Sequence, residues 1–127
     1  MAKVVLLSCT QAKLNKLSKA QDLYSPSPFF QTTKTIGESL KPDKTYILSS
    51  KHHLVPLDKL LEPYDMALKD FNKFQKKQWA EIVISQMNGE GIILEYDTFI
   101  FLTDNEYIKP LEKYIPEKNI KYLQYIK

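Results

Sequence analysis

The sequence predicts a three-layer α/β domain in which a mostly parallel, open sheet of about four strands carries helices on both faces. Two observations lead to this prediction. Apolar runs of strand length alternate with segments of helical periodicity, an order that requires right-handed crossovers between parallel strands. The length of 127 residues suits one domain, spanning 1–127, with no internal repeat and no interdomain linker.

The first half of the chain contains two predicted strands and one helix. Val4–Ser8 is a continuous apolar run ending in a small polar residue, as in a strand buried on both faces. Residues 9–25 are polar and lysine-rich, which predicts a long loop. Ser27 and Pro28 then suit the N-cap and first turn of a helix that ends near Leu40. Thr45–Ser49 is the second buried strand.

The second half begins with another long segment, residues 51–70, in which we expect a short helical turn at Leu57–Leu61. Asp70 is the predicted cap of the longest helix, which ends at the Asn-Gly dipeptide 88–89. The apolar positions expected on one face of this helix are Phe71, Phe74, Ile82, Val83 and Met87.

Three further elements complete the predicted fold. Thr98–Leu102 is a strand, Asp104 caps a helix that runs through Tyr114, and Ile120–Ile126 is a last strand at an edge of the sheet.

Composition excludes several classes of protein. All 18 basic residues are lysines and the net charge is only +3, which argues against arginine-led base readout and against a dedicated duplex-DNA binder. The lack of arginine is typical of a phage or a low-GC bacterium. One cysteine cannot form an internal disulfide, and no apolar run approaches the roughly 20 residues of a membrane span. We therefore expect a cytoplasmic protein, in the host cytoplasm if it is phage-encoded, with no membrane partner.

Glycine is scarce, with three residues in all, and no phosphate-binding glycine loop or zinc-protease motif occurs. This argues against kinases, NTPases and dinucleotide enzymes, and we predict neither a cofactor nor a metal. His52 and His53 are adjacent and point apart, so a surface or capping role competes with metal binding.

A pocket is expected where the two long loops leave the carboxyl ends of the strands. The polar residues offered there as ligands of a substrate are Ser8, Thr10, Lys13, Tyr24, Ser50, Lys51, Tyr64 and Asp65, and the candidate catalytic residues are Glu62, Asp22 and Cys9.

Each of these candidates has an ordinary structural alternative. Cys9 is either a nucleophilic thiol at a strand end or a small residue packed there. The Glu62 to Asp65 segment holds two carboxylates beside a proline-fixed turn, suited to acid–base chemistry, to a ribose hydroxyl, or to capping backbone N–H groups. The rings of Tyr24 and Tyr64 stack on a base or pack in the core.

Four segments resemble a domain family of unknown function that is common in bacteria and phages. The segments are residues 6–13, 20–29, 46–55 and 62–65, and they are similar to the patterns I-P-C-S-K-T-K, A-R-x-L-Y-x-S-x-L-F, W-Y-I-L-S-A-K-Y-G-L-L and I-x-P-Y-D-x-x-L. The match continues in order to residues 106–111. In this chain His52-His53 replaces Tyr-Gly, which predicts that a glycine-dependent turn is lost or reshaped, and Gln21 replaces arginine.

The third and fourth segments also resemble the YaaA-type peroxide-stress proteins, and the first resembles a domain of archaeal tRNA-guanine transglycosylase relatives. Asp65 stands where the YaaA-type pattern has arginine. These resemblances imply a pocket for a nucleobase or nucleotide.

Three functions remain open from the sequence. The first is an enzyme of N-glycosidase or transglycosylase type, a hydrolase or transferase in which Glu62 or Asp22 stabilises positive charge on the sugar. The second is a non-catalytic protein that sequesters a nucleotide or associates with DNA, in stress or in phage counter-defence. The third is an interaction module without a pocket. The expected partner is a nucleobase, a nucleotide or DNA, and the chain is a monomer or a homodimer.

Overall fold

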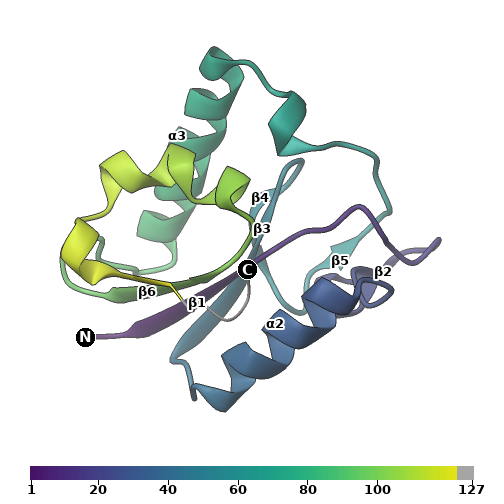
Figure 1. Cartoon of the computed structure of the whole chain (residues 1–127), viewed down its shortest axis with the longest axis horizontal. Helices are drawn as coiled ribbons and strands as arrows, with labels where there is room; N and C mark the ends of the chain where they lie inside the picture. Colours follow the sequence, from purple (N-terminus) through teal and green to yellow (C-terminus); the bar gives the residue numbers. More distant parts are fainter. Residues whose placement is uncertain (123–127) are drawn as a thin grey trace.

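The computed structural model describes residues 1–122 and confirms the α/β class, with a five-stranded sheet between layers of helix (Figure 1). The strands lie in the order β4-β3-β1-β6-β7, and β4 is antiparallel to its neighbour while the other pairs are parallel. Their bounds are β1 Lys3–Ser8, β3 Lys44–Ser49, β4 His53–Pro56, β6 Thr98–Leu102 and β7 Ile120–Tyr122. The sheet has one more strand than predicted.

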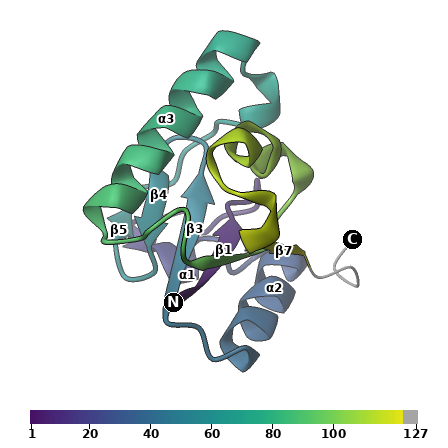
Figure 2. The ribbon, with the colours of Figure 1, turned by 90° about the vertical axis from the view of Figure 1, so that its left-hand side faces the viewer.

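Helix α2 (Pro28–Ser39) covers one face of the sheet, and its start is the predicted one. The side chain of Ser27 accepts a hydrogen bond from the backbone N–H of Phe30 at 3.2 Å, and Pro28 occupies the first turn. Gly37 brings the helix close to the sheet, because a Cβ atom there would lie 3.0 Å from a methyl group of Val5. Figure 2 shows α2 and α3 on opposite sides of the strands.

Helix α3 (Lys73–Gly89) covers the other face and begins later than predicted. Its cap is Asn72, in a reciprocal pair of hydrogen bonds with Gln75, whereas the predicted cap Asp70 ends a short 3-10 turn, η1 (Leu68–Asp70). The predicted apolar face is partly wrong. Val83 and Met87 are buried, as is Trp79, but Phe74 is 66% exposed and Ile82 is 44% exposed.

The two segments that were predicted as long loops contain short strands that pair with each other. β2 (Ser18–Lys19) and β5 (Leu60–Leu61) form an antiparallel two-stranded sheet, and α1 (Ala20–Leu23) follows β2 directly. The predicted helical turn at Leu57–Leu61 is therefore wrong, and so is the prediction that residues 9–25 form one long loop. A ladder between segments some forty residues apart depends on tertiary pairing, which local periodicity does not record.

Strand β4 forms a hairpin with β3, and the turn between them keeps a glycine-like conformation. His53 has φ +68°, in the left-handed region that favours glycine. This chain therefore places a histidine, at the position where the resembled pattern has glycine, in a backbone conformation that favours glycine.

The segment after β6 is a series of 3-10 turns where one helix was predicted. These are η2 (Asn105–Tyr107), η3 (Lys109–Tyr114) and η4 (Glu117–Asn119). Asp104 is the cap, as predicted, since its carboxylate accepts a hydrogen bond from the N–H of Glu106 at 3.0 Å. Pro110 has no N–H to donate, which limits a continuous α-helix here.

Strand β7 lies at the sheet edge, as predicted; the part of that prediction beyond Tyr122 lies outside the described residues. Within residues 1–122, no helix has both the length and the apolar character needed to cross a bilayer.

Candidate active site

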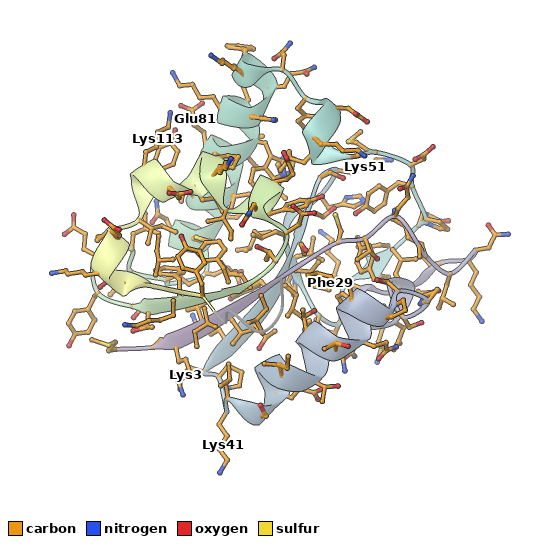
Figure 3. The ribbon with its side chains drawn as sticks, in the orientation of Figure 1. Lys3, Phe29, Lys41, Lys51, Glu81 and Lys113 are labelled. Carbon is orange, nitrogen blue, oxygen red and sulfur yellow. The ribbon has the colours of Figure 1, made fainter. Side chains whose placement is uncertain are left out.

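A pocket of about 280 Å³ opens at the carboxyl end of β1, where the sequence analysis expected it. Its wall comes from the end of β1, the start of α2, the segment that leads into η1, and the η2 turn. The lining residues are Ser8, Cys9, Thr10, Gln11, Lys13, Phe29, Asp65, Met66, Ala67, Leu68, Lys69, Asp104, Glu106 and Tyr107. Figure 3 marks Phe29 at the start of α2, beside the chain that leaves β1.

Cys9 lies at the pocket wall, where the residue is 8% exposed and its thiol contacts two hydroxyl groups. The Sγ atom is 3.0 Å from the hydroxyl of Tyr107 and 4.0 Å from the hydroxyl of Ser50. Burial raises the pKa of Tyr107, so its phenol stays protonated at neutral pH. The hydroxyl of Ser50 in turn donates to the carbonyl oxygen of Met66 at 2.7 Å. These contacts fix the thiol to both sides of the pocket.

A cluster of hydroxyl groups lies behind this wall. The hydroxyl of Tyr64 is 2.7 Å from that of Tyr24 and 2.7 Å from that of Ser49. Burial raises the pKa of both tyrosines, which keeps the phenols neutral. Tyr24 is fully buried against Phe30, with ring centroids 5.4 Å apart, so its ring packs in the core.

Lys13 connects the pocket with the tyrosine cluster. Its ammonium nitrogen lies 4.5 Å from the ring centroid of Tyr64, within cation–π range, and it lines the pocket. Burial lowers the pKa of Lys13, while the neighbouring Cys9 and Asp65 oppose this shift. A cation partly removed from water at a pocket wall is suited to hold an anionic group.

The remaining predicted residues of β1 and its loop have structural partners. The Ser8 hydroxyl accepts a hydrogen bond from the N–H of Asp104 at 3.5 Å, and the Thr10 hydroxyl donates to the carbonyl of Ala12 at 3.0 Å. Lys51 is exposed at the turn after β3 and is not one of the residues that line the pocket.

The predicted catalytic carboxylates do not meet in this pocket. Glu62 and Asp22 are exposed and stand outside the described residues that line it. Of the predicted acids, the structure places Asp65 at the pocket, together with two that were not selected, Asp104 and Glu106.

Sequence reasoning also missed Phe29 and Tyr107. Both lie in the segments that carry the family resemblance, residues 20–29 and 106–111, so their membership in those segments was the available signal.

His52 and His53 stand apart from this pocket. The His52 ring meets the edge of Tyr64 with centroids 5.3 Å apart, and burial, with the neighbouring Lys51, lowers its pKa. Across residues 1–122, no three His, Cys, Asp or Glu side chains gather as a metal site.

No curated protein and no solved structure shows significant similarity to the chain. The model of one protein family, described as a family of unknown function, matches residues 4–126 and so covers nearly the whole chain. The matched range includes every residue that lines the pocket. The chain therefore belongs to DUF6884, a family of unknown function.

Proposed function

We propose that the pocket binds a nucleoside or nucleotide and that the protein cleaves its N-glycosidic bond, with Asp65 as the catalytic carboxylate. The observation that carries the proposal is the combination of groups around one small cavity: the Phe29 ring, the Lys13 and Lys69 ammonium groups, and the Asp65 carboxylate. A base, a phosphate and a sugar each have a matching group there.

The size of the pocket and the chemistry of its wall support a nucleotide-sized ligand. Its volume of about 280 Å³ is near the lower end of ligand pockets, which suits one nucleoside better than a dinucleotide cofactor. The ring of Phe29 is 36% exposed and available for stacking on a base. Lys13 and Lys69 supply positive charge for a phosphate without an arginine fork.

The proposed reaction is hydrolysis, with the Asp65 carboxylate beside the sugar. The bond between the anomeric carbon and the base nitrogen breaks, and its electron pair leaves with the base. Water adds its oxygen to the anomeric carbon, and a proton from that water ends on the base. The Asp65 carboxylate stabilises positive charge on the sugar and orients the attacking water.

The test compares two acids of the same loop. Purified protein is incubated with purine and pyrimidine nucleosides and 5′-nucleotides, and free base is measured by chromatography. Asp65→Asn should abolish release of base, whereas Glu62→Gln, outside the pocket lining, should leave it at the wild-type rate. Equal loss in both variants, or unchanged release in Asp65→Asn, would refute the role of Asp65.

A second candidate is binding without turnover, as in a protein that sequesters a nucleotide or accompanies DNA in stress or phage counter-defence. It is favoured by the exposure of Asp65 and Asp104, because water around a carboxylate weakens the electrostatic stabilisation of positive charge on the sugar. Stoichiometric binding of a nucleotide by calorimetry, with no free base after long incubation, would select this candidate over the enzyme.

A further inference from the structure

Lysines line both sides of a groove between α3 and η3. Lys73, Lys76 and Lys77 come from the first turns of α3, and Lys109 and Lys113 come from η3 on the opposite side. Spacings of three and four residues place Lys73, Lys76 and Lys77 on one face of α3. Pro110 and Glu112 complete the lining. The groove therefore gathers positive charge from two segments that are more than thirty residues apart in sequence.

Acidic residues only partly balance this charge. Lys76 pairs with Glu106 at 3.6 Å, in a bridge that is largely open to solvent. Glu112 of η3, which itself lines the groove, is the second acid there. Lys73, Lys77 and Lys113 are exposed, which leaves their ammonium groups accessible to a partner in solution.

The groove adjoins the candidate active site. Glu106 lines the pocket and holds Lys76, which lines the groove. On the other side, Lys69 lines the pocket and lies four residues before Lys73 of the groove, through the η1 turn. A negatively charged polymer that extends out of the pocket therefore reaches the lysines of the groove first.

We propose that the substrate is a nucleotide within a single-stranded nucleic acid, whose phosphodiester backbone lies along the α3–η3 groove while one nucleoside occupies the pocket. This inference rests on the proposed function, because it needs the pocket to accept a nucleoside. Lysines act as point charges that bind phosphates without distinguishing the bases. The groove therefore contributes affinity and orientation, and the pocket selects the nucleoside.

A single strand fits these observations better than a duplex or an acidic protein. A base inside a duplex must first be unstacked and unpaired to reach a pocket, whereas a base in a single strand is already free to enter. An acidic protein surface offers no group for the pocket next to the groove. Regularly spaced phosphates that follow one base satisfy both features at once.

The experiment measures binding of fluorescently labelled, twelve-residue oligo(dT) and oligo(rU) by anisotropy over a range of salt concentrations. The groove variant carries Lys73→Gln, Lys77→Gln and Lys113→Gln. The control carries Lys16→Gln, Lys19→Gln and Lys41→Gln, three exposed lysines outside the groove lining, and therefore has the same net charge. Thermal unfolding checks that both variants remain folded.

We expect the slope of log K against log salt to become less negative by about 2 in the groove variant, since each single-strand phosphate contact contributes roughly 0.7 to its magnitude. At 0.1 M salt this corresponds to about a hundredfold loss of affinity. The control should keep the wild-type slope. Binding of a single nucleotide and release of base from it should be unchanged in the groove variant, because the three lysines are not part of the pocket.

Three results would overturn the inference. The first is an equal loss of affinity in the groove and control variants. The second is wild-type binding of oligonucleotides that is no tighter than binding of a mononucleotide, which would leave the proposed function intact. The third is equal or tighter binding of duplex DNA or of polyglutamate. Failure of the proposed function is separate: it appears as absent mononucleotide binding and turnover while oligonucleotides still bind through the groove.

Discussion

The carboxylate of Asp97 accepts hydrogen bonds from the backbone N–H of Ala2 at 2.9 Å and from that of Ile93 at 2.9 Å. These contacts connect the residue before β1 with the turn before β6, 95 positions along the chain. Asp97 is 5% exposed, and its carboxylate binds the two N–H groups only in the folded state. The start of the central strand is thus fixed by a buried carboxylate.

This arrangement predicts a dependence of stability on pH. Burial raises the pKa of Asp97, but the N–H groups of Ala2 and Ile93, together with the positive charges of the amino terminus and Lys44, outweigh it and hold the pKa below its usual value. The stabilisation is therefore present above the unfolded pKa of about 4 and is lost as the pH falls through the lower folded pKa. Asp97→Asn should cost about 1–3 kcal/mol at pH 7, measured by urea unfolding, and less at pH 3. The control Glu95→Gln, an exposed acid, should change little at either pH.

The turn between β3 and β4 predicts a stabilising substitution. His53 has φ +68°, where a side chain is unfavourable and glycine is not. We expect His53→Gly to raise the free energy of unfolding by about 0.5–1 kcal/mol, after the larger backbone entropy of glycine in the unfolded chain is subtracted. His52→Gly should destabilise instead, because it removes the ring that packs on Tyr64. A loss of stability in His53→Gly would contradict the assignment of strain to this turn.

Two helical glycines are expected to respond oppositely to alanine. A Cβ atom at Gly37 would lie 3.0 Å from Val5, whose buried side chain has no room to move, so Gly37→Ala should destabilise by about 1 kcal/mol or more. At Gly89 no atom lies within 4 Å of the added Cβ atom, so Gly89→Ala should stabilise by up to about 1 kcal/mol through helix propensity. Thermal unfolding of the pair tests both signs.

The tyrosine cluster predicts unequal costs for loss of its hydroxyl groups. Tyr64→Phe removes the hydroxyl that contacts both Tyr24 and Ser49, whereas Tyr24→Phe removes only the hydrogen bond between Tyr24 and Tyr64. We expect Tyr64→Phe to cost about 2 kcal/mol and Tyr24→Phe about 1 kcal/mol. Equal costs in denaturant unfolding would show that Tyr64 does not connect the cluster.

The parts of the fold that depend on local sequence pattern could be predicted from the sequence. The buried strands at β1, β3 and β6 and the Ser27-Pro28 start of α2 have signals within a few residues, and they were predicted. The β2–β5 ladder and the hairpin strand β4 depend on partners elsewhere in the chain, and they were missed. The start of α3 was misplaced because Asp70 and Asn72 are both good caps, and only the reciprocal bonds with Gln75 decide between them.

The candidate site was predicted in position but only partly in composition. Strand ends and long loops were enough to place Cys9, Lys13 and Asp65 at one edge of the sheet. The pattern did not separate Glu62 from Asp65, which lie three residues apart, because the fold of the loop decides which of them borders the cavity. Nor did it reveal that Tyr24 turns inward, since an aromatic residue suits a core and a binding wall equally well.

The two-residue pairing of β2 with β5 joins the loops that follow β1 and β4 in a small sheet of their own, apart from the five-stranded sheet. The loops are held to each other by this short ladder, by two further bonds from the N–H groups of Ala20 and Gln21 to the carbonyls of Lys59 and Leu57, and by the contact between the hydroxyls of Tyr24 and Tyr64. A strand pairing as short as that of β2 with β5 opens at a small fraction of the free energy of global unfolding. Hydrogen exchange at these amides should report an opening event that leaves the five-stranded sheet closed, and a ligand that bridges the loops would slow that exchange first.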